Sequence, residues 1–200
     1  MNKLLVILIA LLSSLNIAYA QGNISVGKAK SKLCSTCHGV DGNSTSNLYP
    51  KLAGQDAAYL LKQLQAFKSG TRANLIMSAM ASRLSEQDMQ DITAYYASQT
   101  MKQKNATIIK STISHDLYID GDQQRQIIGC GRCHGPQGNG LALAGAPKIA
   151  GQHGAYLASQ LISFRGGRRN HLPKALASDL SDQLTDSEIE QLSEYISTLY

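Results

Sequence analysis

The sequence predicts an all-α protein in which one small domain occurs twice in tandem. Two observations carry this prediction: the second half of the chain repeats the first, and apolar residues recur at a helical period without sustained strand alternation. The clearest repeat is Pro50-Lys51-Leu52-Ala53-Gly54-Gln55, which returns 97 residues later as Pro147-Lys148-Ile149-Ala150-Gly151-Gln152. The two halves are therefore expected to be copies of one fold.

The repeat continues on both sides of that run. Cys34 returns as Cys130 at a spacing of 96 residues, and Tyr95 returns as Tyr195 at a spacing of 100. A chain of 200 residues is long enough for two domains of this size. We expect the domains to span residues 21–98 and 115–200, joined by a polar linker over 99–114.

Each half is predicted to be mostly helical. A short helix over 27–34 leads into the first cysteine pair, and residues 57–69 carry apolar side chains at a helical period. The run Ser85-Glu86-Gln87-Asp88 resembles an N-terminal cap for a helix that continues to Ser98. Its counterpart, Thr185-Asp186-Ser187-Glu188, is a capping box for a helix that ends near Tyr200.

The first twenty residues have the pattern of a secretory signal peptide. Lys3 precedes the apolar run Leu4–Leu12, and Ala18-Tyr19-Ala20 forms an A-x-A cleavage site. The apolar run is well below the ~20 residues that a membrane-spanning helix needs. We expect cleavage after Ala20 and export to the periplasm, with an uncleaved anchor as the alternative.

The four cysteines form two copies of one chemical motif. They lie in Cys34-Ser35-Thr36-Cys37-His38 and Cys130-Gly131-Arg132-Cys133-His134. C-x-x-C-H is the attachment motif of c-type haem: two thiols, one helical turn apart, bond to the porphyrin, and the adjacent histidine becomes an axial iron ligand. We therefore predict two covalently bound haem c groups, held by Cys34, Cys37, Cys130 and Cys133, with His38 and His134 as iron ligands.

Two other uses of paired cysteines explain the sequence less well. A thioredoxin-like redox pair needs neither the trailing histidine nor a second copy. A zinc site needs the four cysteines gathered at one place and leaves the duplication unexplained.

Both halves resemble class I cytochrome c domains, and the tandem is similar to the dihaem cytochrome c4 family. The matching motifs are the paired C-x-x-C-H-G, the P-K-[LI]-A-G-Q runs and the closing L-[ST]-x-x-[DE] helices. The resemblance covers nearly the whole chain after residue 20. It implies that a methionine before the last helix ligates iron opposite the histidine. It also implies that the backbone carbonyls of Pro50 and Pro147 help to orient the imidazoles.

In the first half the resemblance places the methionine ligand at Met77, seven residues before Leu84. Met80 is the alternative, because it lies in the same segment. Met89 falls inside the last predicted helix and is expected to pack in the core. Met101 falls in the linker.

The second half departs from the family pattern, because no methionine follows Met101. Counting seven residues back from Leu184 leads to Ala177, which cannot bind iron. Three alternatives stay open: His171 ligates the second iron, Lys174 ligates it, or the sixth position is open to water or a gas. Imidazole is a good iron ligand, but His171 also fits a surface residue on a basic loop.

The other histidines and the basic residues carry weaker expectations. His153 aligns with Asp56, which is no ligand, and is expected on the surface; His115 is expected to be solvated in the linker. Arg165, Arg168 and Arg169 lie beside the second haem's loop, either as a basic rim that steers an acidic redox partner or as a solvated face or propionate partners.

Together these features predict a periplasmic electron carrier and no enzyme. The resemblance implies a bc1-type or other quinol-oxidising donor and a haem–copper terminal oxidase as acceptor, with only peripheral contact to membrane complexes. Nucleic acid is excluded as a partner by the modest net charge of +5 and the few aromatic residues. The alternative is a haem enzyme or gas-binding protein that uses an open second iron.

Overall fold

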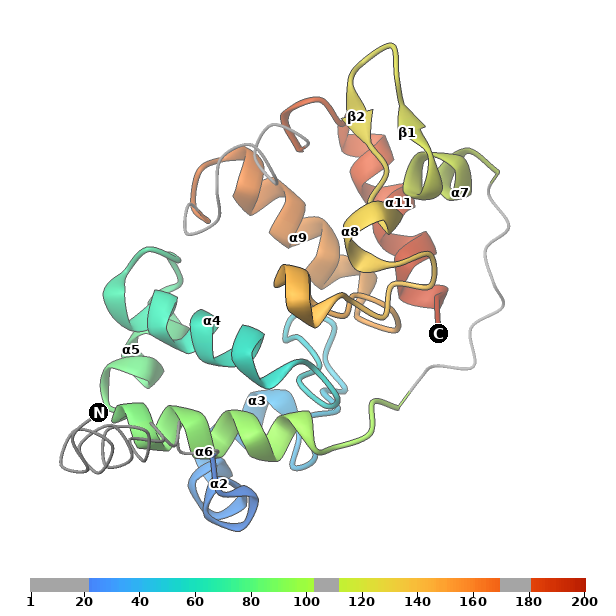
Figure 1. Ribbon diagram of the computed structural model, residues 1–200. Coiled ribbons are helices and arrows are strands. Elements are labelled where there is room, and N and C mark those ends of the chain that lie inside the picture. Colours follow the sequence, from blue (N-terminus) through green and yellow to red (C-terminus); the bar gives the residue numbers. More distant parts are fainter. Residues whose placement is uncertain (1–21, 103–111, 170–180) are drawn as a thin grey trace, which may run out of the picture.

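The structure is a computed structural model that describes residues 22–102, 112–169 and 181–200. It confirms two helical domains in tandem: the N-terminal half (blue to green) and the C-terminal half (yellow to red) form separate bodies in Figure 1. The expected signal peptide lies outside the described residues. Within those residues, no helix is both long and apolar enough to cross a membrane.

The N-terminal half contains five helices in its described part: α2 (Ile24–Lys30), α3 (Lys32–His38), α4 (Ala57–Ser69), α5 (Leu75–Ser82) and α6 (Glu86–Ala97). Helix α4 has the bounds that the sequence predicted. The single helix predicted over 27–34 is instead two helices that meet at Ser31. The Ser31 hydroxyl donates to the carbonyl of Lys28, and such local bonds compete with a continuous helix.

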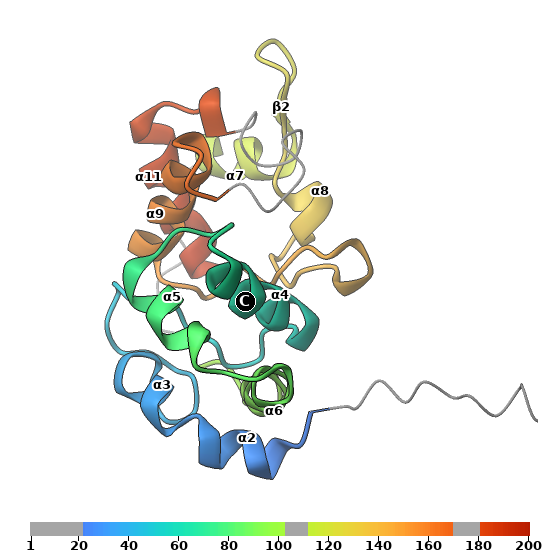
Figure 2. The same ribbon diagram turned by 90° about the vertical axis from the view of Figure 1, so that its left-hand side faces the viewer.

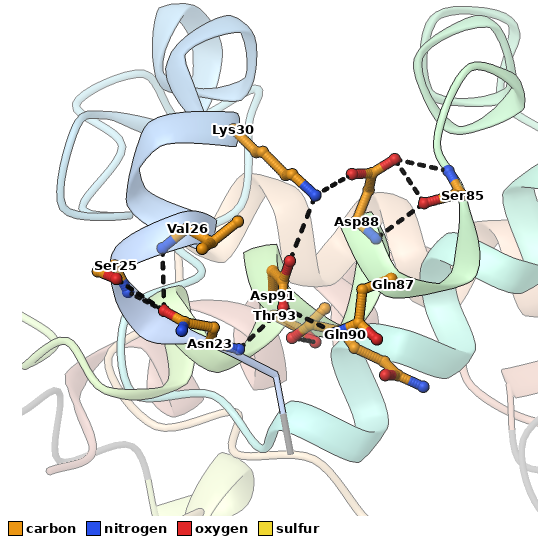
Figure 3. Close-up of polar contacts among 10 residues, drawn as sticks. All are labelled: Asn23, Ser25, Val26, Lys30, Ser85, Gln87, Asp88, Gln90, Asp91 and Thr93. Atoms are coloured by element: carbon orange, nitrogen blue, oxygen red, sulfur yellow. Dashed lines mark hydrogen bonds and ion pairs between the residues drawn. The ribbon is translucent and has the colours of Figure 1, made fainter. Parts of the chain in front are cut away.

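Helices α2 and α6 cross in close contact, which fixes the N-terminal helix on the domain. A Cβ atom on Gly27 would lie 1.9 Å from the carbonyl oxygen of Asp91, so only glycine fits there. The buried carboxylate of Asp91 accepts from the Asn23 backbone N–H at 2.8 Å and from Gln87 Nε2 at 2.9 Å, and it also contacts Lys30 (Figure 3). Lys30 pairs with Asp88 as well.

The C-terminal half repeats this plan with small additions. Its described elements are α7 (Thr112–Ile119), β1 (Gly121–Asp122), β2 (Ile127–Ile128), α8 (Gly131–His134), the 3-10 helix η1 (Ala142–Ala144), α9 (Gly154–Arg165) and α11 (Asp186–Thr198). The two strands pair antiparallel, with Gly121 opposite Ile128. Two-residue strands are too short to produce a visible alternation in the sequence.

Each half has its own hydrophobic core. One cluster is centred on Leu60, Ile92, Tyr95 and Tyr96, and the other on Tyr118, Ile189, Leu192 and Ile196 among others. The last helix of each half starts with a capping box, Ser85 with Asp88 and Thr185 with Glu188. The box predicted at Thr185 is confirmed, and the cap predicted at Ser85 is a full box.

The two halves meet along one helix of each. Figures 1 and 2 show α4 and α9 facing one another across the boundary, and hydrogen bonds connect the two halves there. The haem motifs, on α3 and α8, belong to different bodies.

Candidate functional site

The cysteines of both motifs lie on or beside a short helix, and none of the four forms a disulfide. Cys34 and Cys37 lie on α3, while Cys130 precedes α8 and Cys133 lies within it. Burial raises the pKa of Cys34, and raises that of Cys130 to about 11. A redox-active C-x-x-C pair needs a lowered thiol pKa, and the raised pKa of Cys34 and of Cys130 does not favour disulfide exchange.

The histidine that ends each motif is held by a backbone carbonyl. His38 Nδ1 lies 2.9 Å from the oxygen of Pro50, and His134 Nδ1 lies 2.8 Å from the oxygen of Pro147. A carbonyl oxygen only accepts, so Nδ1 carries the proton and the lone pair of Nε2 is left for a metal. Burial lowers the pKa of both imidazoles, which favours this neutral form.

The proline carbonyls are placed by the same two hydrogen bonds in each half. In the first, the backbone N–H groups of Leu52 and Ala53 donate to the carbonyl of Gly42 at 2.7 and 3.1 Å. In the second, Ile149 and Ala150 donate to Gly138 at 2.8 and 3.0 Å. These bonds close the loop that runs from each motif to its proline.

A glycine follows each histidine because the backbone turns sharply there. Gly39 has φ 82° and Gly135 has φ 80°, in the region that favours glycine. In the first half a Cβ atom would also lie 2.8 Å from the carbonyl oxygen of Asn43. The sixth residue of C-x-x-C-H-G is thus set by backbone geometry.

These sites fit covalent haem. Each offers two thiols, a neutral imidazole with Nε2 available, and apolar side chains on neighbouring segments. In the first half, Val40, Leu48, Leu75 and Ile76 are exposed in the protein alone. Exposed apolar surface of this extent is typical of a surface that another group covers.

The two candidate methionines of the first half lie one turn apart on α5. Met77 is half-buried and its backbone N–H is capped by Asn74, whereas Met80 is exposed. The segment that carries both methionines is a helix, begun by the Asn74 cap. Met89 is fully buried, as predicted, and Met101 is also buried although it follows the last helix of its domain.

The candidate ligands of the second half, His171 and Lys174, lie outside the described residues. His153 is described, and the surface position expected for it is wrong: it is 6% exposed, and Nε2 lies 3.0 Å from the carbonyl oxygen of Ser44 in the other half. The alignment of His153 with Asp56 did not show that the two halves are in contact at His153. His115 is exposed, as expected, although it lies within α7.

The three arginines near the second haem's loop do not form a basic rim. Arg165 donates to the carbonyl of Leu184 and pairs with Asp186. Arg169 is buried, with its guanidinium 4.2 Å from the centre of the Phe164 ring. Of the three, only Arg168 is exposed. Sequence reasoning missed that Arg169 belongs to the domain interface.

The fold and the paired sites define a dihaem c-type cytochrome. The family model described as Cytochrome c matches residues 26–100 and 125–200, one match in each half. The chain is 40% identical to cytochrome c4 of Pseudomonas aeruginosa over 201 residues, covering 100% of both proteins. It therefore belongs to the cytochrome c4 family and carries two covalently bound haem c groups.

Other comparisons agree in fold and in class. The crystal structure of reduced recombinant cytochrome c4 from Pseudomonas stutzeri superimposes with a TM-score of 0.84 at 40% identity, covering 90% of this chain and 100% of that one. The chain is also 35% identical over 171 residues to a thiosulfate dehydrogenase electron acceptor from Stutzerimonas stutzeri, covering 83% of this chain and 78% of that protein. The coarse function follows: the protein is a dihaem cytochrome that carries electrons between redox proteins.

Proposed function

We propose that this carrier works in the periplasm, taking single electrons from a respiratory donor and passing them to a terminal oxidase or another acceptor, without catalysing a reaction itself. The observation that carries the proposal is the repeated histidine arrangement. In both halves, a buried imidazole is bound through Nδ1 to a backbone carbonyl. A ligand fixed in this way changes little when the iron changes charge, which suits electron transfer.

When bound, haem supplies a one-electron iron couple. Nε2 of His38 and Nε2 of His134 would each hold one such iron. The bond from Nδ1–H to the proline carbonyl increases the basicity of each imidazole and fixes its orientation. In the first half we assign the opposite ligand to Met77, with Met80 as the alternative on the same helix.

The second haem is expected to differ, because no methionine follows Met101 in the sequence. Methionine ligation raises a haem potential, and axial ligands shift haem potentials over ~0.8 V. If His171 ligates the second iron instead, the second haem would have the lower potential, and electrons would run from it to the first; if the site is open, ligand chemistry would take the place of electron storage. We keep His171 as the candidate sixth ligand, with Lys174 and an open site as the alternatives.

The donor and acceptor classes come from the family. We propose a bc1-type or other quinol-oxidising donor and a haem–copper oxidase as acceptor. The likeness to a thiosulfate dehydrogenase electron acceptor favours a second donor class, a thiosulfate-oxidising enzyme. Stopped-flow reduction of the oxidised protein by each purified donor separates the two, since the physiological donor should reduce a ferric haem at a rate that saturates with the donor concentration.

The alternative function, gas binding or catalysis at an open second iron, is tested by titrating the reduced, haem-loaded protein with carbon monoxide. An unchanged absorption spectrum is expected for a carrier with two firmly six-coordinate irons. Binding of one equivalent of carbon monoxide to the wild-type protein favours the gas-binding or catalytic alternative and weakens the assignment of His171.

A further inference from the structure

Two arginine side chains lie side by side in the buried boundary between the halves. Arg72 is 6% exposed and Arg169 is 7% exposed. Both guanidiniums donate to the same two side-chain oxygens. Arg72 donates to Gln63 Oε1 and to Gln160 Oε1, each at 2.7 Å. Arg169 donates to the same two atoms at 3.1 and 3.0 Å. Two shared acceptor atoms keep the two positive charges close together.

Within the part of the chain that the structure describes, no carboxylate pairs with either arginine. The other partners are uncharged: Arg72 donates to the Tyr156 hydroxyl at 2.9 Å, and Arg169 donates to that of Tyr59 at 3.4 Å. Each guanidinium also lies over a phenylalanine ring of its own half, 4.4 and 4.2 Å from the ring centre. Nε of Arg169 is buried and has no hydrogen-bond partner among the described residues.

Two like charges buried together call for an anion. Guanidinium groups stay protonated in proteins, so neither arginine can lose its charge. Burial lowers the pKa of Arg169, and the positive charge of Arg72 lowers it further. Buried charges are normally paired, and planar guanidiniums suit the two oxygens of a carboxylate. The boundary thus has both the charge and the hydrogen-bond donors that bind a carboxylate.

Haem c carries carboxylates of this kind. Its two propionates lie at the edge of the porphyrin opposite the vinyl groups, to which the motif cysteines bond. Arg72 lies between α4 and α5, and α5 carries the candidate iron ligands Met77 and Met80. Arg169 occupies the equivalent place after α9, 97 residues later. An anion from solvent would have to cross the domain boundary to reach these buried groups, so the haem is the favoured source.

We propose that Arg72 and Arg169 together bind haem propionates at the domain boundary, one from each haem. For Arg169 this selects propionate pairing among the roles that the sequence left open. Each guanidinium also contacts the glutamine of the other half, so its charge acts on both haems. A positive charge favours the reduced iron, so the pair raises both reduction potentials. The proposal depends on the two covalent haems and not on the identity of the donor or the acceptor.

The first test measures the reduction potential of each haem in the full haem-loaded chain by spectroelectrochemistry. Arg72→Gln removes the charge and keeps an amide that can donate. It should lower the equilibrium constant for reduction of both haems about tenfold, or ~59 mV. Arg72→Lys keeps the charge and should recover most of this loss. Lys62→Gln, on the exposed side of α4, also removes one positive charge and should change neither potential appreciably, because solvent screens it.

Two outcomes of this measurement overturn the proposal. Unchanged potentials in a folded Arg72→Gln variant would show that the arginine only holds the domains together. A fall confined to the first haem would show that no site is shared between the haems. Potentials of the wild type that vary with phosphate concentration at constant ionic strength would assign the site to a free anion and overturn the proposal as well.

The second test detects the bound group directly. Redox-difference infrared spectroscopy is recorded on protein whose haem carries isotopically labelled propionate carboxylates. The labelled carboxylate band should shift in Arg72→Gln and in Arg169→Gln. If circular dichroism shows that glutamine unfolds the protein, Arg72→Lys serves instead, since an ammonium group cannot form the two parallel hydrogen bonds of a guanidinium and the band should still shift. Identical bands in the wild type and a folded variant overturn the proposal.

Discussion

His153 donates its Nε2–H to the backbone carbonyl of Ser44 in the other domain, at 3.0 Å. The carbonyl can only accept, so the proton lies on Nε2. At the aligned position of the first half, Asp56 accepts the backbone N–H of Tyr59 at 2.7 Å and caps α4. One position thus caps a helix in the first half and joins the domains in the second.

Replacing His153 should weaken the protein more than replacing an exposed histidine. His153→Ala leaves the Ser44 carbonyl without this donor in a buried place, which costs about 1–3 kcal/mol of unfolding free energy. Urea unfolding followed by haem absorption measures the loss. His115→Ala, on the surface of α7, is the control. Equal unfolding free energies for the two variants would contradict a buried cross-domain bond.

Gly27→Ala should destabilise the N-terminal domain by about 1–3 kcal/mol, because helices α2 and α6 must move apart to admit a methyl group. The added Cβ meets the Asp91 carbonyl, part of a helix backbone that cannot yield cheaply. Thermal unfolding by circular dichroism checks this. Lys28→Ala, on the same helix but exposed, should change the melting temperature little. Equal melting temperatures for Gly27→Ala and Lys28→Ala would refute the close crossing of α2 and α6.

The stability of the C-terminal domain should fall in acid because of Glu188. Hydrogen bonds from Arg125, and from the backbone and hydroxyl of Thr185, lower its pKa to about 2. A carboxylate with a lowered pKa stabilises the folded state above its ordinary pKa of 4.5, and this contribution disappears as the pH falls from there toward 2. Glu188→Gln should therefore flatten the pH dependence of the unfolding free energy in that window.

The control for the acid prediction is Glu190→Gln, on the exposed side of the same helix. It should leave the slope between pH 4.5 and 2 as in the wild type. An unchanged slope in Glu188→Gln would mean that the contact with Arg125 is too well solvated to matter.

The assignment of Met77 predicts that its removal opens the first iron. Met77→Ala should bind one equivalent of carbon monoxide more than the wild type in the reduced state, and the potential of the first haem should fall. Met80→Ala should do neither. The reverse result would transfer the ligand role to Met80, one turn further along α5.

The sequence was sufficient for the fold, and the resemblance was sufficient for the hydrogen bonds that orient the two motif histidines. The repeat, the C-x-x-C-H motifs and the helical period of 57–69 depend on local patterns, which survive without knowledge of the tertiary structure. The resemblance also placed Pro50 and Pro147 beside the histidines, and the structure shows both hydrogen bonds.

The domain interface was not predictable in the same way. Lysine, glutamine and arginine on a helix normally indicate a solvated surface, so Arg169 suggested a docking rim and His153 a surface residue. One signal was present: Gln63 and Arg72 recur as Gln160 and Arg169 although they lie outside the haem motifs. Polar residues that occur in both copies indicate a common role. Only the tertiary structure shows that this role is to contact the equivalent residues of the other domain.

The bond between His38 and Pro50 uses a main-chain oxygen, which no side-chain substitution removes. The imidazole side of each site is therefore insulated from most single mutations. Any change in a haem's reduction potential by axial ligation has to come from the face of the haem opposite the imidazole. That face is covered by segments such as α5, which contact it through side chains. The two copies differ there: one has Met77, and the other has no methionine to offer. A fixed half and an adjustable half within each site would let one duplicated domain hold two haems of different potential, as we propose for this chain.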